Sequence, residues 1–121
     1  MKERKAIILF GHGSRDPLWR RPIEAVAARL AEQQPALLVC CAYLELNPPD
    51  LPGATAQLVT QGATEVTVVP MFLGAGKHAR EDLPVLAQAL RRTYPQVRFT
   101  LQQAVGEDPR VLDLLAKIAL E

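Results

Sequence analysis

The sequence contains few of the residues that define several common protein classes. Its two cysteines, Cys40 and Cys41, are adjacent, so on an extended strand they point to opposite faces and are not expected to form a disulfide with each other. They also lack the CxxC spacing of a thiolate metal site. We therefore expect two ordinary strand cysteines.

The chain also lacks an excess of either charge and any long apolar run. Its formal net charge is +1, which argues against a general electrostatic attraction to nucleic acid. The longest apolar run, VTVVPMFLGAG, falls far short of the roughly 20 residues that cross a bilayer, and no signal-length apolar segment opens the chain. We expect a cytoplasmic protein with no nucleic-acid partner and no membrane partner.

Apolar runs bounded by turn residues alternate with stretches of helical period, a pattern typical of successive βα units. The chain has 121 residues and no low-complexity segment or long linker, so we expect one domain over 1–121. The predicted strands cover 5–10, 37–44, 65–72 and 97–104. The predicted helices cover 20–34, 49–62, 80–94 and 108–120.

This pattern predicts an α/β fold with three αβα layers and a four-stranded parallel sheet in the flavodoxin-like order 2-1-3-4. The first three strands are almost continuously apolar, as strands covered on both faces should be. The run 97–104 alternates apolar and polar residues, which favours an edge strand. Gly62 is predicted to end the second helix and Asp108 to cap the fourth, while Glu81 and Asp82 fall in the first predicted turn of 80–94.

The two histidines of the chain both follow predicted strands. His12 lies between two glycines in LFGHGSRD, and His78 follows two glycines in FLGAGKHAREDLP. The carboxyl ends of parallel strands meet at one edge of a sheet, where open α/β sheets bind ligands, and Glu45 closes the second strand at that edge. Three possible metal ligands or proton carriers are thus predicted to converge in loops. The alternatives are surface histidines, a tight GHGS turn and a solvated carboxylate.

Cations and glycines surround the same predicted edge. Arg15, Arg20, Arg21, Lys77 and Arg80 would suit a polyanionic ligand that also meets a transition metal, although charges near helix starts are often only solvated. Gly74 and Gly76 would let the backbone approach a flat ligand closely. Trp19 could be either a core residue or a lid.

Three segments in this order, LFGHGSRDP, YLELNPPDLPGA and VVPMFLGAGKHAREDLP, together resemble the sirohydrochlorin chelatases of the short cobaltochelatase type. The resemblance implies the class II chelatase fold and insertion of a divalent metal into sirohydrochlorin, in cobalamin or siroheme biosynthesis. It implies metal binding by His12 and His78, with Co²⁺ preferred and Fe²⁺ or Ni²⁺ as alternatives. It further implies a homodimer, because the length is half that of the usual two-lobed enzyme, and no nucleotide or organic cofactor.

The expected reaction assigns a role to each group of residues. Two pyrrole protons must leave as the metal enters, so a carboxylate or an imidazole must accept them. The expected catalytic residues are His12, Glu45 and His78. The expected substrate-binding residues are Gly13, Ser14, Arg15, Gly74, Gly76, Lys77 and Arg80.

Two other functions compete with this interpretation. One is a metal or tetrapyrrole carrier without catalysis, which turnover measurements would distinguish from a chelatase. The other is a histidine phosphatase, which would need an arginine beside the nucleophile. Phe10 and Gly11 precede His12 instead, so that function is disfavoured.

Overall fold

The computed structural model describes residues 3–121 and contains one parallel sheet of four strands. The strand order is β2-β1-β3-β4, which confirms the predicted fold class. The strands are β1 (Lys5–Gly11), β2 (Leu38–Tyr43), β3 (Glu65–Pro70) and β4 (Arg98–Leu101). The helices are α1 (Arg21–Gln33), α2 (Leu51–Thr60), α3 (Lys77–Thr93) and α4 (Pro109–Ala119), with 3-10 turns η1 (Pro17–Arg20) and η2 (Val105–Glu107).

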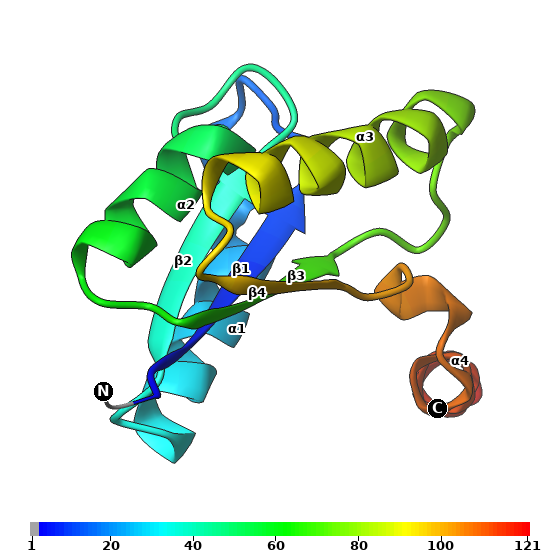
Figure 1. Ribbon diagram of the computed structural model, residues 1–121. Coiled ribbons are helices and arrows are strands. Elements are labelled where there is room, and N and C mark those ends of the chain that lie inside the picture. Colours follow the sequence, from blue (N-terminus) through cyan, green and yellow to red (C-terminus); the bar gives the residue numbers. More distant parts are fainter. Residues whose placement is uncertain (1–2) are drawn as a thin grey trace.

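The helices lie on both faces of the sheet, as right-handed crossovers require for this strand order. Figure 1 shows α2 and α3 over one face and α1 under the other. The larger core cluster lies beneath α2 and α3 and includes the fully buried Ile8 and Phe10 of β1. The smaller cluster joins Leu9 to Ile23 of α1. Successive residues of β1 thus serve opposite cores, which explains its almost continuous apolar sequence.

Several predicted turns are confirmed. Asp108 caps α4, because its side chain accepts a hydrogen bond from the Arg110 N–H, and Pro109 occupies the first helical position. Gly62 follows α2 with a φ of +98°, a left-handed conformation that glycine adopts without strain. In the edge strand β4, Phe99 is buried and Thr100 is exposed, as the alternating pattern predicts.

The prediction for the start of the third helix is wrong. It begins at Lys77 and not at residue 80, because Gly76 takes an extended cap conformation and its carbonyl accepts the Arg80 N–H at 3.0 Å. Glu81 and Asp82 therefore lie beyond the first turn, which holds no acidic residue. Their predicted pairing with the helix dipole is not realised.

Three predicted strands are also too long. The second covers Leu38–Tyr43 and not 37–44. The third ends at Pro70, and the fourth ends at Leu101, although the Gln102 N–H still donates to the Val68 carbonyl of β3 at 3.0 Å. Cys40 and Cys41 carry free thiols and pack on opposite sides of the sheet, as expected. Among residues 3–121, no helix has the length and apolar character needed to span a membrane.

Candidate functional site

The carboxyl edge of the sheet brings the loops after β1 and β2 together. Gly11 ends β1 opposite Tyr43, the last residue of β2, so the next residues of both strands leave the sheet side by side. Two backbone hydrogen bonds continue the pairing beyond the strands: the Leu44 N–H donates to the Gly11 carbonyl at 2.9 Å, and the Glu45 N–H donates to the His12 carbonyl at 3.1 Å. These bonds place the side chains of His12 and Glu45 at the same point of the edge.

His12 and Glu45 form a direct pair. The His12 Nε2 lies 3.4 Å from the Glu45 Oε1, and both side chains are 58% exposed. The ring of Phe72 meets the His12 ring edge to face, with centroids 6.4 Å apart, and so limits the imidazole on one side. The pair is therefore oriented by the protein yet open to a ligand from solvent. A carboxylate beside an imidazole can hold a metal ion or take up a proton.

Gly13 is the residue that permits this close approach of the two loops. Its φ is +103°, and a Cβ built at this position would overlap the Glu45 carbonyl. Both the backbone conformation and the available space therefore require glycine here. The structure thus gives Gly13 a role between the two loops, and its predicted contact with substrate stays a prediction.

Asn47 adds a second link between the loops, and sequence reasoning did not single it out. Its Oδ1 accepts the Ser14 N–H at 2.8 Å, so it holds the chain that follows His12. Leu46, between Glu45 and Asn47, has a φ of +69°, and the Asn47 N–H donates to the Glu45 carbonyl at 2.8 Å. These features define a γ-turn, a strained conformation for leucine that the surrounding contacts must stabilise.

His78 occupies a different place from the one predicted. It is the second residue of α3 and not a loop residue, and its side chain is exposed. Within the described part of the chain, no group of three or more His, Cys, Asp or Glu side chains is close enough to hold a metal ion. The structure therefore brings His12 and Glu45 together but does not add His78 to them.

The predicted cations are exposed at the same edge. Arg15 follows the His12 loop, and Lys77 and Arg80 lie in the first turn of α3 and just after it. Across residues 3–121, none of these three cations forms an ion pair with a carboxylate. Gly74 and Gly76 lie in the loop before α3, and a Cβ added to either would have no atom within 4 Å, so their backbone borders open space.

Aromatic residues beneath the site are held by packing. A Cβ on Gly11 would lie only 3.1 Å from the Trp19 ring and 3.4 Å from the Tyr43 ring, so Gly11 makes room for both. Trp19 is 39% exposed and packs beside Tyr43, which makes it neither a buried core residue nor a free lid. Burial raises the pKa of Tyr43 to about 12, so its phenol stays protonated at neutral pH and supplies no base.

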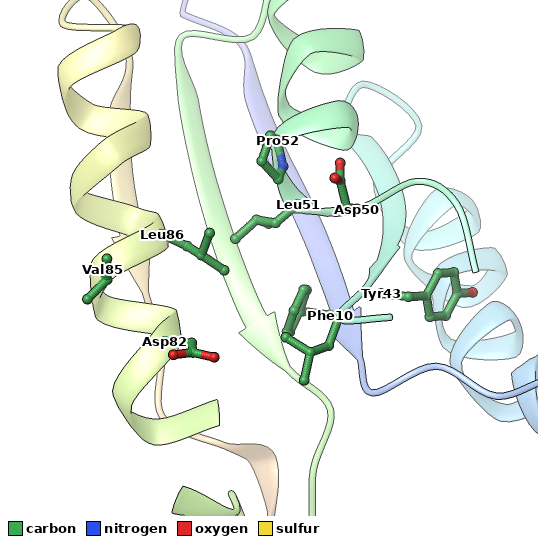
Figure 2. A pocket seen from close by; sticks show the side chains of 9 residues that line it. Phe10, Tyr43, Asp50, Leu51, Pro52, Asp82, Val85 and Leu86 are labelled. Atoms are coloured by element: carbon green, nitrogen blue, oxygen red, sulfur yellow. The ribbon is translucent and has the colours of Figure 1, made fainter. Parts of the chain in front are cut away.

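A hollow of about 360 Å³ lies next to the site, between the start of α2 and α3. Figure 2 shows Asp50 and Asp82 on opposite sides of it, with the ring of Phe10 between them. Neither histidine lines it. Its two carboxylates would repel an anionic ligand, so the open edge beside His12 suits such a ligand better than this hollow.

The fold and the paired histidine and carboxylate at a strand-end edge define an α/β domain with an open, ligand-accessible site. The CbiX family model matches residues 6–121, and this chain belongs to that family. The chain is 30% identical over 113 residues to a sirohydrochlorin cobaltochelatase of Sulfolobus acidocaldarius, covering 93% of this chain and 88% of that protein.

Two further similarities bear on size and metal. A crystal structure described as a putative cobalamin (vitamin B12) biosynthesis CbiX protein from Marinobacter aquaeolei VT8 superposes with a TM-score of 0.81 at 32% identity, covering 95% of this chain and 93% of that one. A sirohydrochlorin ferrochelatase of Priestia megaterium is 29% identical over 112 residues, covering 93% of this chain but 42% of that protein. The chain thus spans nearly all of the Marinobacter fold and less than half of the Priestia protein.

Proposed function

We propose that this protein is a chelatase that inserts a divalent metal, Co²⁺ or Fe²⁺, into sirohydrochlorin. The observation that carries the proposal is the exposed pair of His12 Nε2 and Glu45 Oε1, 3.4 Å apart at the carboxyl edge of a CbiX-family fold. Relatives named for cobalt and for iron both match the chain, and imidazole nitrogen suits either metal. Co²⁺ is our preferred metal, as the sequence resemblance implies.

In this proposal the metal and the tetrapyrrole are both substrates. His12 would hold the metal ion beside Glu45, and His78, which stands apart from this pair here, would join it when metal and macrocycle are bound, leaving coordination positions for the four pyrrole nitrogens. Two N–H bonds break as the metal enters, and the two protons pass to Glu45 and to an imidazole before they reach solvent. The products are the metallated macrocycle and two protons, so charge balances without a redox step.

The cations are assigned to substrate binding. Sirohydrochlorin carries several carboxylates, and Arg15, Lys77 and Arg80 are exposed cations with no carboxylate partner in residues 3–121. Gly74 and Gly76 border open space, where the flat macrocycle could approach the backbone. Ser14 and Gly13 hold the loop that presents His12.

A purified-protein assay tests this function. Sirohydrochlorin is mixed with Co²⁺, Fe²⁺ or Ni²⁺ in turn, and metal insertion is followed by the visible spectrum. His12→Ala and His78→Ala should each lower the rate at least ~10-fold, because each removes a metal ligand, while the fold stays intact because both side chains are exposed. Glu45→Gln should lower the rate less and alter its pH profile.

The outcomes separate a chelatase from a carrier. Many turnovers per protein molecule support the enzyme, whereas binding of metal or tetrapyrrole without turnover would support the carrier. Near-normal turnover in both histidine variants would refute the site assignment. An unchanged pH profile for Glu45→Gln would leave Glu45 with a structural role only.

We also propose that two copies pair around the substrate. The site is open, with His12 and Glu45 each 58% exposed, so a flat macrocycle bound at this edge would leave one face in water. A twofold pair would cover that face with a second, identical surface. Sedimentation that finds only monomers, at concentrations where the enzyme is fully active, would refute the pairing.

A further inference from the structure

Helix α4 has an apolar side that its own chain does not cover. No residue of α4 is buried, and five large apolar side chains along the helix or just beyond it are 41–88% exposed: Leu112, Leu114, Leu115, Ile118 and Leu120. Val111, Leu115 and Ile118 repeat at the spacing of one helix face, while Asp113 and Lys117 lie on the other. Such a stripe normally packs against a core.

The sheet has a matching surface without a helix. On the face that carries α1, this helix packs mainly against β1 and β2. Val69 of β3 reaches only the margin of the α1 cluster, and among residues 3–121 no helix layer covers β4 on this face. Val69 and Met71 lie on that face and are only partly buried, and Thr100 of β4 beside them is exposed. In a doubly wound fold, a helix following the edge strand would cover this surface.

The chain between β4 and α4 holds the helix away from that surface. In Figure 1, α4 stands apart from the sheet, beyond the end of β4, and is joined to it through η2. The Gly106 N–H of η2 donates to the Phe72 carbonyl at 2.9 Å, and a Cβ at Gly106 would overlap the backbone of Leu73. Asp108 then caps α4 and pairs with Arg110 at 2.7 Å, which fixes the start of the helix. These contacts fix η2 at the sheet edge and the first turn of α4, so α4 starts away from the surface that it would cover.

We propose that α4 is exchanged between two copies of this chain, each helix covering the bare β3–β4 surface of the other. The inference rests on the pairing proposed above, though not on the metal chemistry. Exchange of an identical element requires no new surface, since the helix and the surface that accepts it are present in both copies.

The area available fits such a pair. At the usual transfer free energy per unit of apolar area, burying a Leu or Ile side chain removes roughly 60–120 Å² of apolar surface from water. The five partly exposed side chains of α4 therefore offer roughly 300 Å² per helix. Two helices and the two sheet surfaces that receive them would bury roughly 1,200 Å² in total, which reaches the size of a stable protein interface.

The same arrangement links pairing to the site. Gly106 at the base of α4 contacts Phe72 and Leu73, and the Phe72 ring packs against His12. Docking of α4 on a partner therefore restrains the loop that runs from Phe72 to His78. Residues 105–107 act here as positioning residues, and loss of exchange should affect the site even though α4 touches no reacting atom.

A set of glutamine variants tests the role of the α4 stripe. Leu115→Gln and Ile118→Gln place a polar side chain on the apolar face, and Asp113→Gln places the same side chain on the opposite face as the control. Glutamine favours helix, so α4 should form in all three. By sedimentation equilibrium, the two stripe variants should raise the dimer dissociation constant at least ~10-fold and the control less than ~3-fold. Equal effects in all three, or no effect in the stripe variants, would overturn the proposal.

Cysteine cross-linking then tests the exchange itself. In a background with Cys40→Ala and Cys41→Ala, one chain carries Ile118→Cys and another carries Thr100→Cys. After the two are mixed and mildly oxidised, exchange predicts a disulfide-linked pair of unlike chains. A third chain carries both Ile118→Cys and Thr100→Cys. If this chain forms an intramolecular disulfide while the mixture of singly substituted chains forms no cross-link, α4 folds back on its own sheet and the proposal is overturned. Dimers by sedimentation without any cross-link would overturn the exchange but leave the pairing, whereas monomers alone would refute both.

Discussion

Replacing Gly13 with alanine should separate the two groups of the proposed site. The substitution adds one carbon where the φ is +103° and where that carbon would overlap the Glu45 carbonyl. Neither problem can be relieved by rotating a side chain, because the obstacle is backbone. The loop after β1 must move away from the loop after β2, and His12 must move with it.

The expected cost follows from the contacts that are lost. Left-handed backbone costs an L-residue about 1–2 kcal/mol. Loss of the Glu45–His12 backbone hydrogen bond and of the Ser14–Asn47 bond costs about 1 kcal/mol each. The reduced entropy of the unfolded alanine chain offsets about 0.4–1 kcal/mol. The free energy of unfolding should therefore fall by roughly 2–4 kcal/mol.

Urea unfolding measures this change directly. With a denaturant slope of about 2 kcal/mol per molar urea, the middle of the usual range, the midpoint should fall by about 1–2 M at a fixed protein concentration. Metal insertion should fall at least ~10-fold, because His12 and Glu45 no longer meet. Gly74→Ala is the matched control: its new carbon would have no atom within 4 Å, so its unfolding midpoint should stay the same or rise slightly. If Gly13→Ala unfolds at the wild-type midpoint, the close contact between the two loops is not a feature of the folded protein.

Three further predictions concern residues around the site. Asn47→Ala should lower the rate of metal insertion and reduce the free energy of unfolding by about 1 kcal/mol. Asn47→Asp keeps an acceptor for the Ser14 N–H and should retain most of the wild-type rate. Equal insertion rates in the two variants would contradict a positioning role for Asn47. The pKa of Tyr43 is raised to about 12 in the folded protein, whereas the phenol of the unfolded chain ionises near pH 10. Ionisation of the unfolded chain therefore favours unfolding, and in urea titrations between pH 9 and 11 the stability of the wild type should fall more steeply than that of Tyr43→Phe. Parallel stability curves would refute this. Lys77→Gln and Arg80→Gln should raise KM more than they lower kcat, and added salt should do the same. The control Arg92→Gln, at the far end of α3, should not change KM. A KM that responds neither to these two substitutions nor to salt would exclude electrostatic binding of the carboxylates.

Much of the fold could be predicted from local patterns. Apolar runs and turn residues identified all four strands and all four helices, because periodicity and capping act over a few residues. The start of α3 was missed, since Gly76 caps the helix without any side-chain signal. For this reason His78 was predicted to lie in a loop, whereas it lies in the first turn of α3.

The site was predictable in part for the same reason. His12 and Glu45 follow neighbouring parallel strands, so topology alone brought them to one edge, and their pairing at 3.4 Å agrees with the predicted convergence. Asn47 was not found, because its contact to Ser14 spans 33 residues and asparagine in a loop carries no distinctive pattern. Gly13 was predicted only as a substrate-binding residue. Its fit against the Glu45 carbonyl was not predicted, since the sequence cannot show which backbone lies beside a glycine.

The sequence by itself determined the alternation of strands and helices, the sheet edge that carries His12 and Glu45, and the Asp108 cap of α4, because these depend on local periodicity, on capping residues and on the handedness of the crossovers. Only the tertiary structure decided that Gly13 lies against the Glu45 carbonyl, that His78 stands apart from the His12–Glu45 pair, and that α4 leaves its apolar stripe uncovered. These features depend on contacts between segments distant in sequence. Such contacts are set by packing of the whole chain, which no local pattern encodes.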